Sequence, residues 1–326
     1  MNAAPALEPG CRCGHSEGHL VPRFGARDYV TGEHFEVAGC SRCGLDVTTP
    51  APDAAAMGAY YPPSYYGRPG ARRFPLAVEE VQRLLYRRRV RQVERLAGGR
   101  GRVLDIGCGP GLLLEAFRRR GWEVHGTELS DTAAARARSI GIPVQVGALD
   151  AWPWPDGHFD AVTLWHVLEH WADPATVLAQ VARLLRPGGA AMVAVPNFGS
   201  IEAQLTRDGW FHLDVPRHLV HFTPGSLERA LAGAGLVVQR RSFGALEYDT
   251  LSFVQSVLNR AGVRHNLLYN LLRGRDALQD DAGSWIPRLA TLAAAVPLWA
   301  LAVPVTSVLN LARTGSAVTL HAVRRG

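Results

Sequence analysis

The most constraining feature of the sequence is a short apolar run, residues 103–106, which leads into a turn containing three glycines. The run predicts a buried strand, and the apolar spacing of residues 112–117 predicts a helix directly after the turn. Gly107, Gly109 and Gly111 suit this turn, because glycine allows a tight reversal and lets a ligand approach the backbone without meeting a Cβ. The sequence therefore predicts a strand–turn–helix unit with a ligand at the turn.

A second predicted strand, residues 123–127, ends in Glu128, whose carboxylate can accept hydrogen bonds from both hydroxyls of a ribose. Together the two strands predict a nucleoside-binding βαβ unit. The dinucleotide fingerprint Gly-x-Gly-x-x-Gly requires glycine at position 112, where this chain has Leu112. We therefore favour a smaller nucleoside ligand over a dinucleotide, and a nucleotide-binding oxidoreductase is the alternative.

The spacing Gly107-x-Gly109-x-Gly111 resembles motif I of the class I S-adenosylmethionine-dependent methyltransferases. The predicted strands that follow, through the Leu-Arg-Pro-Gly-Gly of residues 185–189, resemble the same family, and the core is similar to the ubiquinone-pathway O-methyltransferases. The resemblance implies an α/β fold with a Rossmann-like seven-stranded sheet. It also implies S-adenosylmethionine as the cofactor and methyl transfer as the activity.

The resemblance further implies which residues hold the cofactor. Residues 147–155 resemble the segment that contacts adenine, although Ala148 stands where many relatives have an acidic residue, so Asp150 or another acceptor must receive the exocyclic amine. The residues after the fourth predicted strand, 159–164, fall at the carboxyl edge of the sheet, where ligands bind. The expected cofactor-binding residues are Asp105, Gly107, Gly109, Gly111, Glu128, Leu129, Ala148, Leu149, Asp150, Trp165 and His166.

Methyl transfer to a hydroxyl requires alignment of the acceptor and a base, a task that suits histidine. His218 and His221 lie in an aromatic segment, residues 210–224, which by the resemblance covers the acceptor. We predict one of them as the base, slightly ahead of His170. Arg217 is expected to hold an anionic group of the acceptor. The alternative is a packed loop whose histidines bond to the backbone.

His166, Glu169 and His170 form a second cluster, and they share one face if the segment is helical. They could hold a divalent ion or form a base with its orienting carboxylate. The cluster resembles the Glu-x-x-Glu-His site of the ubiquinone-pathway enzymes, with His166 in place of the first Glu. The alternative is that His166 lines the cofactor pocket while Glu169 and His170 cap the helix.

Four of the five cysteines precede residue 45, and such clustering in a reducing compartment favours zinc over disulfides. Cys40 and Cys43, followed by glycine, have the spacing of a zinc knuckle. The first half of the site is less regular, and His15 competes there as a ligand. Zinc ribbons followed by a Tyr-rich linker resemble those of a bacterial group of class I methyltransferases. The predicted ligands of a structural zinc are Cys11, Cys13, Cys40 and Cys43, and the alternative is a module that has lost its metal.

Residues 289–312 are apolar, carry no charge, and are flanked by Arg288 and Arg313. Their length allows a transmembrane helix, but Pro297 and Pro304, with Asn310, predict a broken one. Residues 317–323 predict a further strand, which by the resemblance pairs antiparallel with the sixth, residues 236–243, so the chain returns to its sheet and cannot cross a bilayer once. We predict contact with a membrane surface, and the alternatives are a buried core helix, a cover for the acceptor or a homodimer interface.

The net charge of +6 comes from arginines scattered along the chain, which does not favour nucleic acid as a partner. The arginines of residues 87–91 are expected to form a solvated helix face. No apolar stretch of signal-peptide length begins the chain, so we predict a cytoplasmic protein, peripheral on the inner face of the membrane. The predicted organisation is 1–58 zinc-ribbon-like module, 59–98 Tyr-rich linker and leading helix, 99–249 core through strand six, 250–313 apolar helical insertion and 314–326 final strand.

The predicted function is S-adenosylmethionine-dependent O-methylation of a small or lipid-linked acceptor of the glycan, quinone or polyketide type, assisted by a histidine base. Two alternatives stay open at this point. One is a protein that binds S-adenosylmethionine without turnover, and the other is a zinc-ribbon nucleic-acid methyltransferase.

Overall fold

The computed structural model describes residues 20–41, 43–61, 76–147, 154–245, 248–272 and 285–326. Internal contacts divide the chain into two compact units. We call Glu79–Val195, Pro224–Ser242 and Val318–Gly326 the core unit, and Met1–Val78, Pro196–Thr223 and Phe243–Ala317 the accessory unit. Each unit is described by itself.

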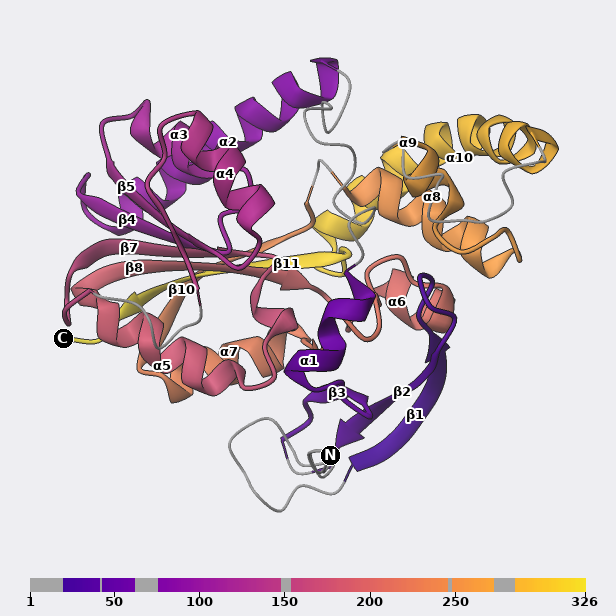
Figure 1. The fold of residues 1–326 in the computed structure, drawn as a ribbon, viewed down its shortest axis with the longest axis horizontal. Helices are drawn as coiled ribbons and strands as arrows, with labels where there is room; N and C mark the ends of the chain where they lie inside the picture. Colours follow the sequence, from indigo (N-terminus) through magenta and orange to yellow (C-terminus); the bar gives the residue numbers. More distant parts are fainter. Residues whose placement is uncertain (1–19, 42, 62–75, 148–153, 246–247, 273–284) are drawn as a thin grey trace. The chain divides into compact units, whose positions relative to one another are not determined.

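The core unit alternates strands and helices (Figure 1). Its elements are α2 (Leu76–Leu96), β4 (Arg102–Ile106), α3 (Leu112–Arg118), β5 (Glu123–Glu128), α4 (Asp131–Ser139), β6 (Val144–Val146), β7 (Phe159–Trp165), η4 (Leu168–His170), α5 (Pro174–Leu184), β8 (Leu185–Pro196), α7 (Pro224–Gly233), β10 (Leu236–Phe243) and β11 (Ala317–Arg324).

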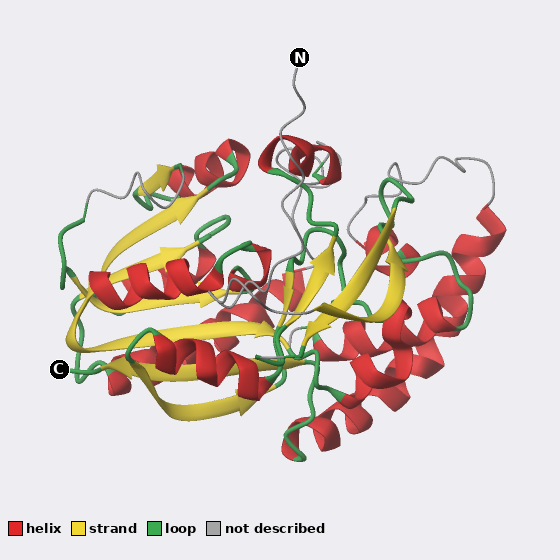
Figure 2. Ribbon diagram, turned by 90° about the horizontal axis from the view of Figure 1, so that it is seen from below, coloured by secondary structure: helices red, strands yellow, loops and turns green. Residues whose placement is uncertain are grey.

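Seven strands form one sheet in the order β10-β11-β8-β7-β4-β5-β6. β4 is an interior strand that pairs in parallel with β5 and β7, so that Asp105 faces Gly126 on one side and Thr163 on the other. Helices α2, α3 and α4 cover one face, and α5 and α7 cover the other (Figures 1 and 2). Because both faces are covered, the central strands are continuous apolar runs. The predicted seven-stranded α/β sheet is confirmed.

The Arg-Pro-Gly-Gly segment, residues 186–189, lies near the start of β8. β8 begins at Leu185, directly after α5, and Leu185 pairs with Phe159. Pairing resumes at Ala190 with Ala161, so residues 186–189 bulge from the ladder. Gly188 has a φ of 73°, a left-handed conformation that suits glycine at such a bulge.

The accessory unit contains a second, four-stranded sheet in the order β1-β2-β3-β9. Its elements are β1 (Leu20–Arg27), β2 (His34–Cys40), β3 (Asp46–Thr49), α1 (Ala54–Met57), η1 (Gly58–Tyr60), α6 (Ile201–Thr206), η5 (Arg207–Gly209), β9 (Val220–His221), α8 (Asp249–Arg260), α9 (Leu267–Leu272) and α10 (Trp285–Leu311). β9 pairs antiparallel with β3, joining Asp46 to His221 and Val47 to Val220. The aromatic segment that follows β8 therefore completes the sheet begun by the N-terminal strands.

α10 runs unbroken through Pro297 and Pro304, so the predicted break is wrong. Proline removes the N–H that would donate to the carbonyl four residues earlier, which belongs to Ala293 for Pro297 and to Ala300 for Pro304. Near Pro304, the hydroxyls of Thr306 and Ser307 donate to other carbonyls, those of Ala302 (2.8 Å) and Val303 (2.7 Å). α8 and α9 pack against α10 (Figure 1).

Asp249, at the start of α8, joins both ends of the helical segment between β10 and β11. One carboxylate oxygen accepts hydrogen bonds from the Ala245 N–H and the Ser316 hydroxyl, and the other accepts one from the Asn310 side-chain amide at 2.7 Å. The Gly244 N–H donates to the Ala317 carbonyl at 2.7 Å. We call this set of contacts the Asp249 clamp. Asn310, taken from the sequence as a helix breaker, is part of the clamp.

Candidate functional site

The turn after β4 has the left-handed backbone that the glycines predict, with φ values of 67°, 53° and 78° at Gly107, Gly109 and Gly111. The three glycines have different surroundings. A Cβ on Gly107 would lie 2.6 Å from a Val167 methyl, and one on Gly111 would lie 3.0 Å from Ala137. A Cβ on Gly109 would meet no atom of the described residues within 4 Å. Among those residues Gly109 therefore faces open space, whereas the other two glycines allow close packing.

The carboxylate of Glu128 lies against the same turn. Its Oε2 accepts a hydrogen bond from the Gly109 N–H at 2.8 Å, and its Oε1 accepts bonds from the N–H groups of Leu129 (2.8 Å) and Ser130 (3.0 Å). A carboxylate offers about four acceptor positions, so the three donors found among the described residues leave one for a ligand, fewer than the two that both hydroxyls of a ribose would need. These bonds fix the orientation of the side chain beside the open space at Gly109.

Asp105 is buried at the end of β4, two residues before the turn. Burial raises the pKa of its carboxyl to about 7, the hydroxyl of Thr163 (2.5 Å from Oδ1) opposes the rise, and the charge of Glu128 adds to it. The same burial raises the pKa of the Cys108 thiol well above its usual range. Cys108 is thus a small buried residue, as its position in the turn predicted.

Trp165 ends β7, and the guanidinium of Arg89 lies over its ring at 3.5 Å from the centroid. Arg89 is buried, which corrects the prediction that residues 87–91 form one solvated face. Arg87, Arg88 and Arg91 are exposed, as predicted. Cation–π contact is what permits one arginine of the run to leave water.

His166 follows Trp165 in a left-handed conformation, with φ of 54°. Its N–H donates to the Ala194 carbonyl, and its Nδ1 lies 3.4 Å from Glu169 Oε1. The helical turn expected to align His166 with Glu169 and His170 is only the 3₁₀ turn η4, which begins after His166. The strained backbone, rather than helical spacing, brings His166 to Glu169.

Two of the histidines predicted as bases, His218 and His221, lie in the accessory unit and have opposite tautomers. His218 Nδ1 lies 2.8 Å from the carbonyl of His212, which can only accept, so Nδ1 carries the proton and Nε2 has the lone pair of the neutral ring. The Thr48 hydroxyl donates to the His218 carbonyl and therefore accepts from His221 Nε2, 3.0 Å away. The lone pair of neutral His221 is then on Nδ1. Both side chains are buried.

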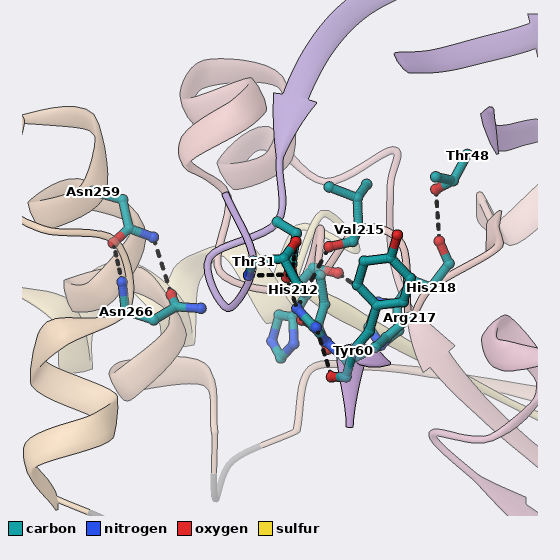
Figure 3. A network of polar contacts seen from close by, with 11 residues as sticks. Thr31, Thr48, Tyr60, His212, Val215, Arg217, His218, Asn259 and Asn266 are labelled. Atoms are coloured by element: carbon teal, nitrogen blue, oxygen red, sulfur yellow. Dashed lines mark hydrogen bonds and ion pairs between the residues drawn. The ribbon is translucent and has the colours of Figure 1, made fainter. Parts of the chain in front are cut away.

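Arg217 directly precedes His218 in sequence, and its side chain has no exposed surface. Figure 3 shows it among Tyr60, Val215 and His218. Its guanidinium donates to carboxylate oxygens of Asp28 (2.7 Å) and Asp214 (2.8 Å) and to the Tyr60 carbonyl (3.0 Å). It also lies over the Tyr29 ring at 4.6 Å. The prediction that Arg217 holds an anionic group of the acceptor is therefore wrong, because two carboxylates of the protein neutralise it.

The sequence profile of the methyltransferase domain family matches residues 74–240, just over half of the 326 residues. A ubiquinone biosynthesis O-methyltransferase of Aeromonas salmonicida is 34% identical over 165 residues, which cover 46% of this chain and 68% of the relative. The chain belongs to the methyltransferase domain family.

A ubiquinone biosynthesis O-methyltransferase of Pseudomonas aeruginosa is 38% identical to this chain over 117 residues, which cover 33% of this chain. The match spans only half the length of that relative. Among solved structures, the [4+2]-cyclase SpnF is similar at a TM-score of 0.52 with 21% identity, covering 84% of the methyltransferase and 97% of SpnF. These likenesses confirm the predicted class I methyltransferase fold. The family assignment confirms an S-adenosylmethionine-dependent methyltransferase.

The predicted knuckle of the methyltransferase begins at the end of β2. Cys40 is buried, its N–H donates to the Leu45 carbonyl, and its carbonyl accepts from the Gly44 N–H, both at 2.8 Å. Gly44 has a φ of 69°. Cys11 and Cys13, like Ala148, Leu149 and Asp150 of the expected adenine segment, lie outside the described residues.

Sequence reasoning missed two features of the methyltransferase. One is Arg89, whose placement over Trp165 depends on packing between α2 and β7 and has no local signal. The other is the ion pair of Arg217 with Asp28, which lie 189 positions apart. The only sequence signal for this ion pair was that Arg217 stands in a largely apolar and aromatic segment, where an arginine needs an acidic partner when it is buried. Leu129, an expected cofactor contact, is 68% exposed beside Glu128.

Proposed function

We propose that the methyltransferase transfers a methyl group from S-adenosylmethionine to a hydroxyl of a small or lipid-linked acceptor of the quinone type. The observation that carries the cofactor assignment is the open space at Gly109 directly beside the oriented carboxylate of Glu128. The acceptor class is supported by relatives named ubiquinone biosynthesis O-methyltransferases. When bound, S-adenosylmethionine supplies a methyl group activated on a sulfonium sulfur.

The residues around the turn fit this cofactor. Glu128 has one acceptor position left for a ribose hydroxyl, and Gly109 presents backbone without a Cβ. Residues 107–111 need no contact with a pyrophosphate, so Leu112 can begin α3 in place of a third dinucleotide glycine. The exposed side of Leu129 offers an apolar surface next to Glu128.

We propose His218 as the base that accepts the proton of the acceptor hydroxyl. The His212 carbonyl fixes its tautomer with Nε2 as the basic nitrogen, and Asp214 Oδ2 lies 4.0 Å from Nε2. His221 and His170 are the other candidates. For His221 the basic nitrogen is Nδ1, because Nε2 donates to Thr48. A carbonyl or carboxylate partner that fixes the tautomer is a common feature of histidine bases.

The test is methyl transfer from labelled S-adenosylmethionine to a catechol with a short isoprenoid tail, with glycan and polyketide acceptors as comparators. We expect transfer to the catechol and its loss in His218→Asn, which keeps an N–H near the His212 carbonyl but has no basic nitrogen. His221→Asn serves as the matched comparison. Binding of S-adenosylmethionine without transfer to any acceptor would instead support the binding-protein alternative. Transfer to RNA would support the nucleic-acid methyltransferase alternative.

A structural zinc in the accessory unit is a further part of the proposal, supported by the turn of Cys40, Cys43 and Gly44. Zinc content measured by mass spectrometry should approach one equivalent per chain and be lost in Cys43→Ser, with a lower melting temperature. A metal-free wild-type chain of equal stability would contradict the zinc proposal.

We further propose that the protein is peripheral at the inner face of the cytoplasmic membrane, where a lipid-linked acceptor would lie.

A further inference from the structure

α10 has one packed face, and its other sides are apolar and exposed. A first series, Thr291, Ala295, Ala302 and Thr306, is buried toward α8 and α9. A second series is apolar and exposed, at Leu289 (54%), Leu292 (40%), Val296 (72%), Trp299 (38%) and Val303 (50%). The two series are centred about 90° apart around the helix, and exposed apolar residues continue beyond the second at Ile286 (62%), Leu301 (56%) and Val308 (62%). We call the second series the exposed face of α10.

The exposed face belongs to the one described helix that is long and apolar enough to cross a membrane by length and composition. Only 17% of its most apolar window, within Ile286–Leu311, is buried in the protein. Soluble proteins rarely expose so continuous an apolar surface, which marks a contact with lipid or protein.

The polarity of the exposed sides of α10 distinguishes between these partners. No charged residue occurs between Arg288 and Arg313. Ser307, whose side chain is exposed, donates its hydroxyl to the Val303 carbonyl at 2.7 Å. The exposed sides therefore present neither a charge nor an unbonded hydroxyl, as a hydrocarbon environment requires. A protein partner would require neither property.

We propose that the exposed face of α10 lies in the plane of one bilayer leaflet, with the helix parallel to the membrane surface. This inference rests on the proposed lipid-linked acceptor, and it names the surface of the protein that contacts the membrane holding that acceptor. The helix does not span, because its other face is packed from Thr291 to Thr306 and the Asp249 clamp holds its end at Asn310. Trp299 lies one residue from the middle of α10, a position that is interfacial for an in-plane helix and central in the hydrocarbon for a spanning one.

The test is flotation of the full chain with phosphatidylcholine–phosphatidylglycerol vesicles, without methyl donor or acceptor. We expect the wild type to float and V296E/V303E to lose at least about tenfold in partitioning, since two carboxylates would enter the apolar region. The matched control is Leu205→Glu, at an equally exposed leucine of α6 (72%), which should float like the wild type. V296S/V303S, with an intermediate loss, guards against misfolding of the charged variant.

The orientation is tested by quenching of Trp299 fluorescence with lipids brominated at two depths, taken as the difference between wild type and Trp299→Phe. Stronger quenching by the shallow bromines is expected, and stronger quenching by the deep bromines would overturn the in-plane orientation. Equal flotation of all variants, or equal loss in Leu205→Glu, would overturn the membrane contact. A wild-type dimer that does not float and that V296E/V303E dissociates would assign the face to a second copy of the chain.

The inference and the proposed function can fail separately. V296E/V303E should retain transfer to a water-soluble catechol and lose it only for an acceptor embedded in vesicles. Flotation without any methyl transfer would leave the membrane contact supported and the proposed function rejected. If V296E/V303E and the wild type transferred methyl equally to the water-soluble catechol and to the acceptor embedded in vesicles, α10 would have no role in reaching the acceptor.

Discussion

Glu128 and Arg217 are both charged residues that the sequence marked as ligand contacts, and the structure treats them differently. Glu128 is half-buried and held by three backbone N–H groups, with one acceptor position left beside the open space at Gly109. Arg217 is fully buried, and two carboxylates and a carbonyl occupy its guanidinium. The comparison teaches that a charge next to a motif binds a ligand only where the protein leaves part of its hydrogen-bonding capacity unused.

The largest expected effect is that of Arg217→Met on stability. Removing the guanidinium leaves the buried carboxylate of Asp28 without its cation, which should cost about 3–5 kcal/mol of unfolding free energy. Urea denaturation measures it, and Arg217→Lys, which keeps the charge and loses the fork, should cost less. If Arg217→Met were as stable as wild type but no longer used the acceptor, Arg217 would be a ligand contact after all.

Glu202 extends the comparison to a buried acid held by hydroxyls. Ser252 and Ser256 donate to its Oε1 at 2.6 and 2.8 Å, and burial raises its pKa to about 7 from the usual 4.5. Because the folded-state pKa is the higher one, stability from Glu202 is full below about pH 4.5 and falls as the pH rises to about 7, by about 3 kcal/mol. Thermal melts should show Glu202→Gln more stable than wild type at pH 8, and equal profiles would contradict this.

Glu128→Ala should reduce affinity for S-adenosylmethionine by about 2–3 kcal/mol, roughly 30- to 150-fold, because a charge-assisted hydrogen bond and the fixed turn are both lost. Calorimetry provides the measurement. Unfolding free energy should change much less than in Arg217→Met, because Glu128 is only half-buried. Unchanged affinity would remove Glu128 from the cofactor site.

The smallest effects separate the glycines of the turn. Gly107→Ala should cost about 1–3 kcal/mol of stability, because its Cβ would clash with Val167 at 2.6 Å and φ is positive. Gly109→Ala pays only the backbone cost, about 1 kcal/mol, but should weaken S-adenosylmethionine binding because the Cβ enters the ligand space. Melting temperatures and calorimetry on both variants test this, and the reverse pattern would place the ligand elsewhere.

The sequence predicted the features that depend on local pattern. The seven strands of the core sheet, the positive φ of the three glycines and the position of Glu128 all follow from apolar periodicity and turn chemistry. It failed where distant segments meet: β9 joining the sheet of β3, Arg217 pairing with Asp28, and Arg89 covering Trp165. Proline signals also failed in α10, which stays helical through Pro297 and Pro304 and packs against α8 and α9.

The Asp249 clamp has a consequence for how such chains diversify. It closes residues 245–316 into a lobe with one narrow stem, where Gly244 bonds to Ala317 and Asn310 to Asp249. Length changes inside a closed lobe add only a slowly growing loop entropy and leave the strands on either side in register. The described helices of the lobe can thus vary in length without shifting β10 against β11.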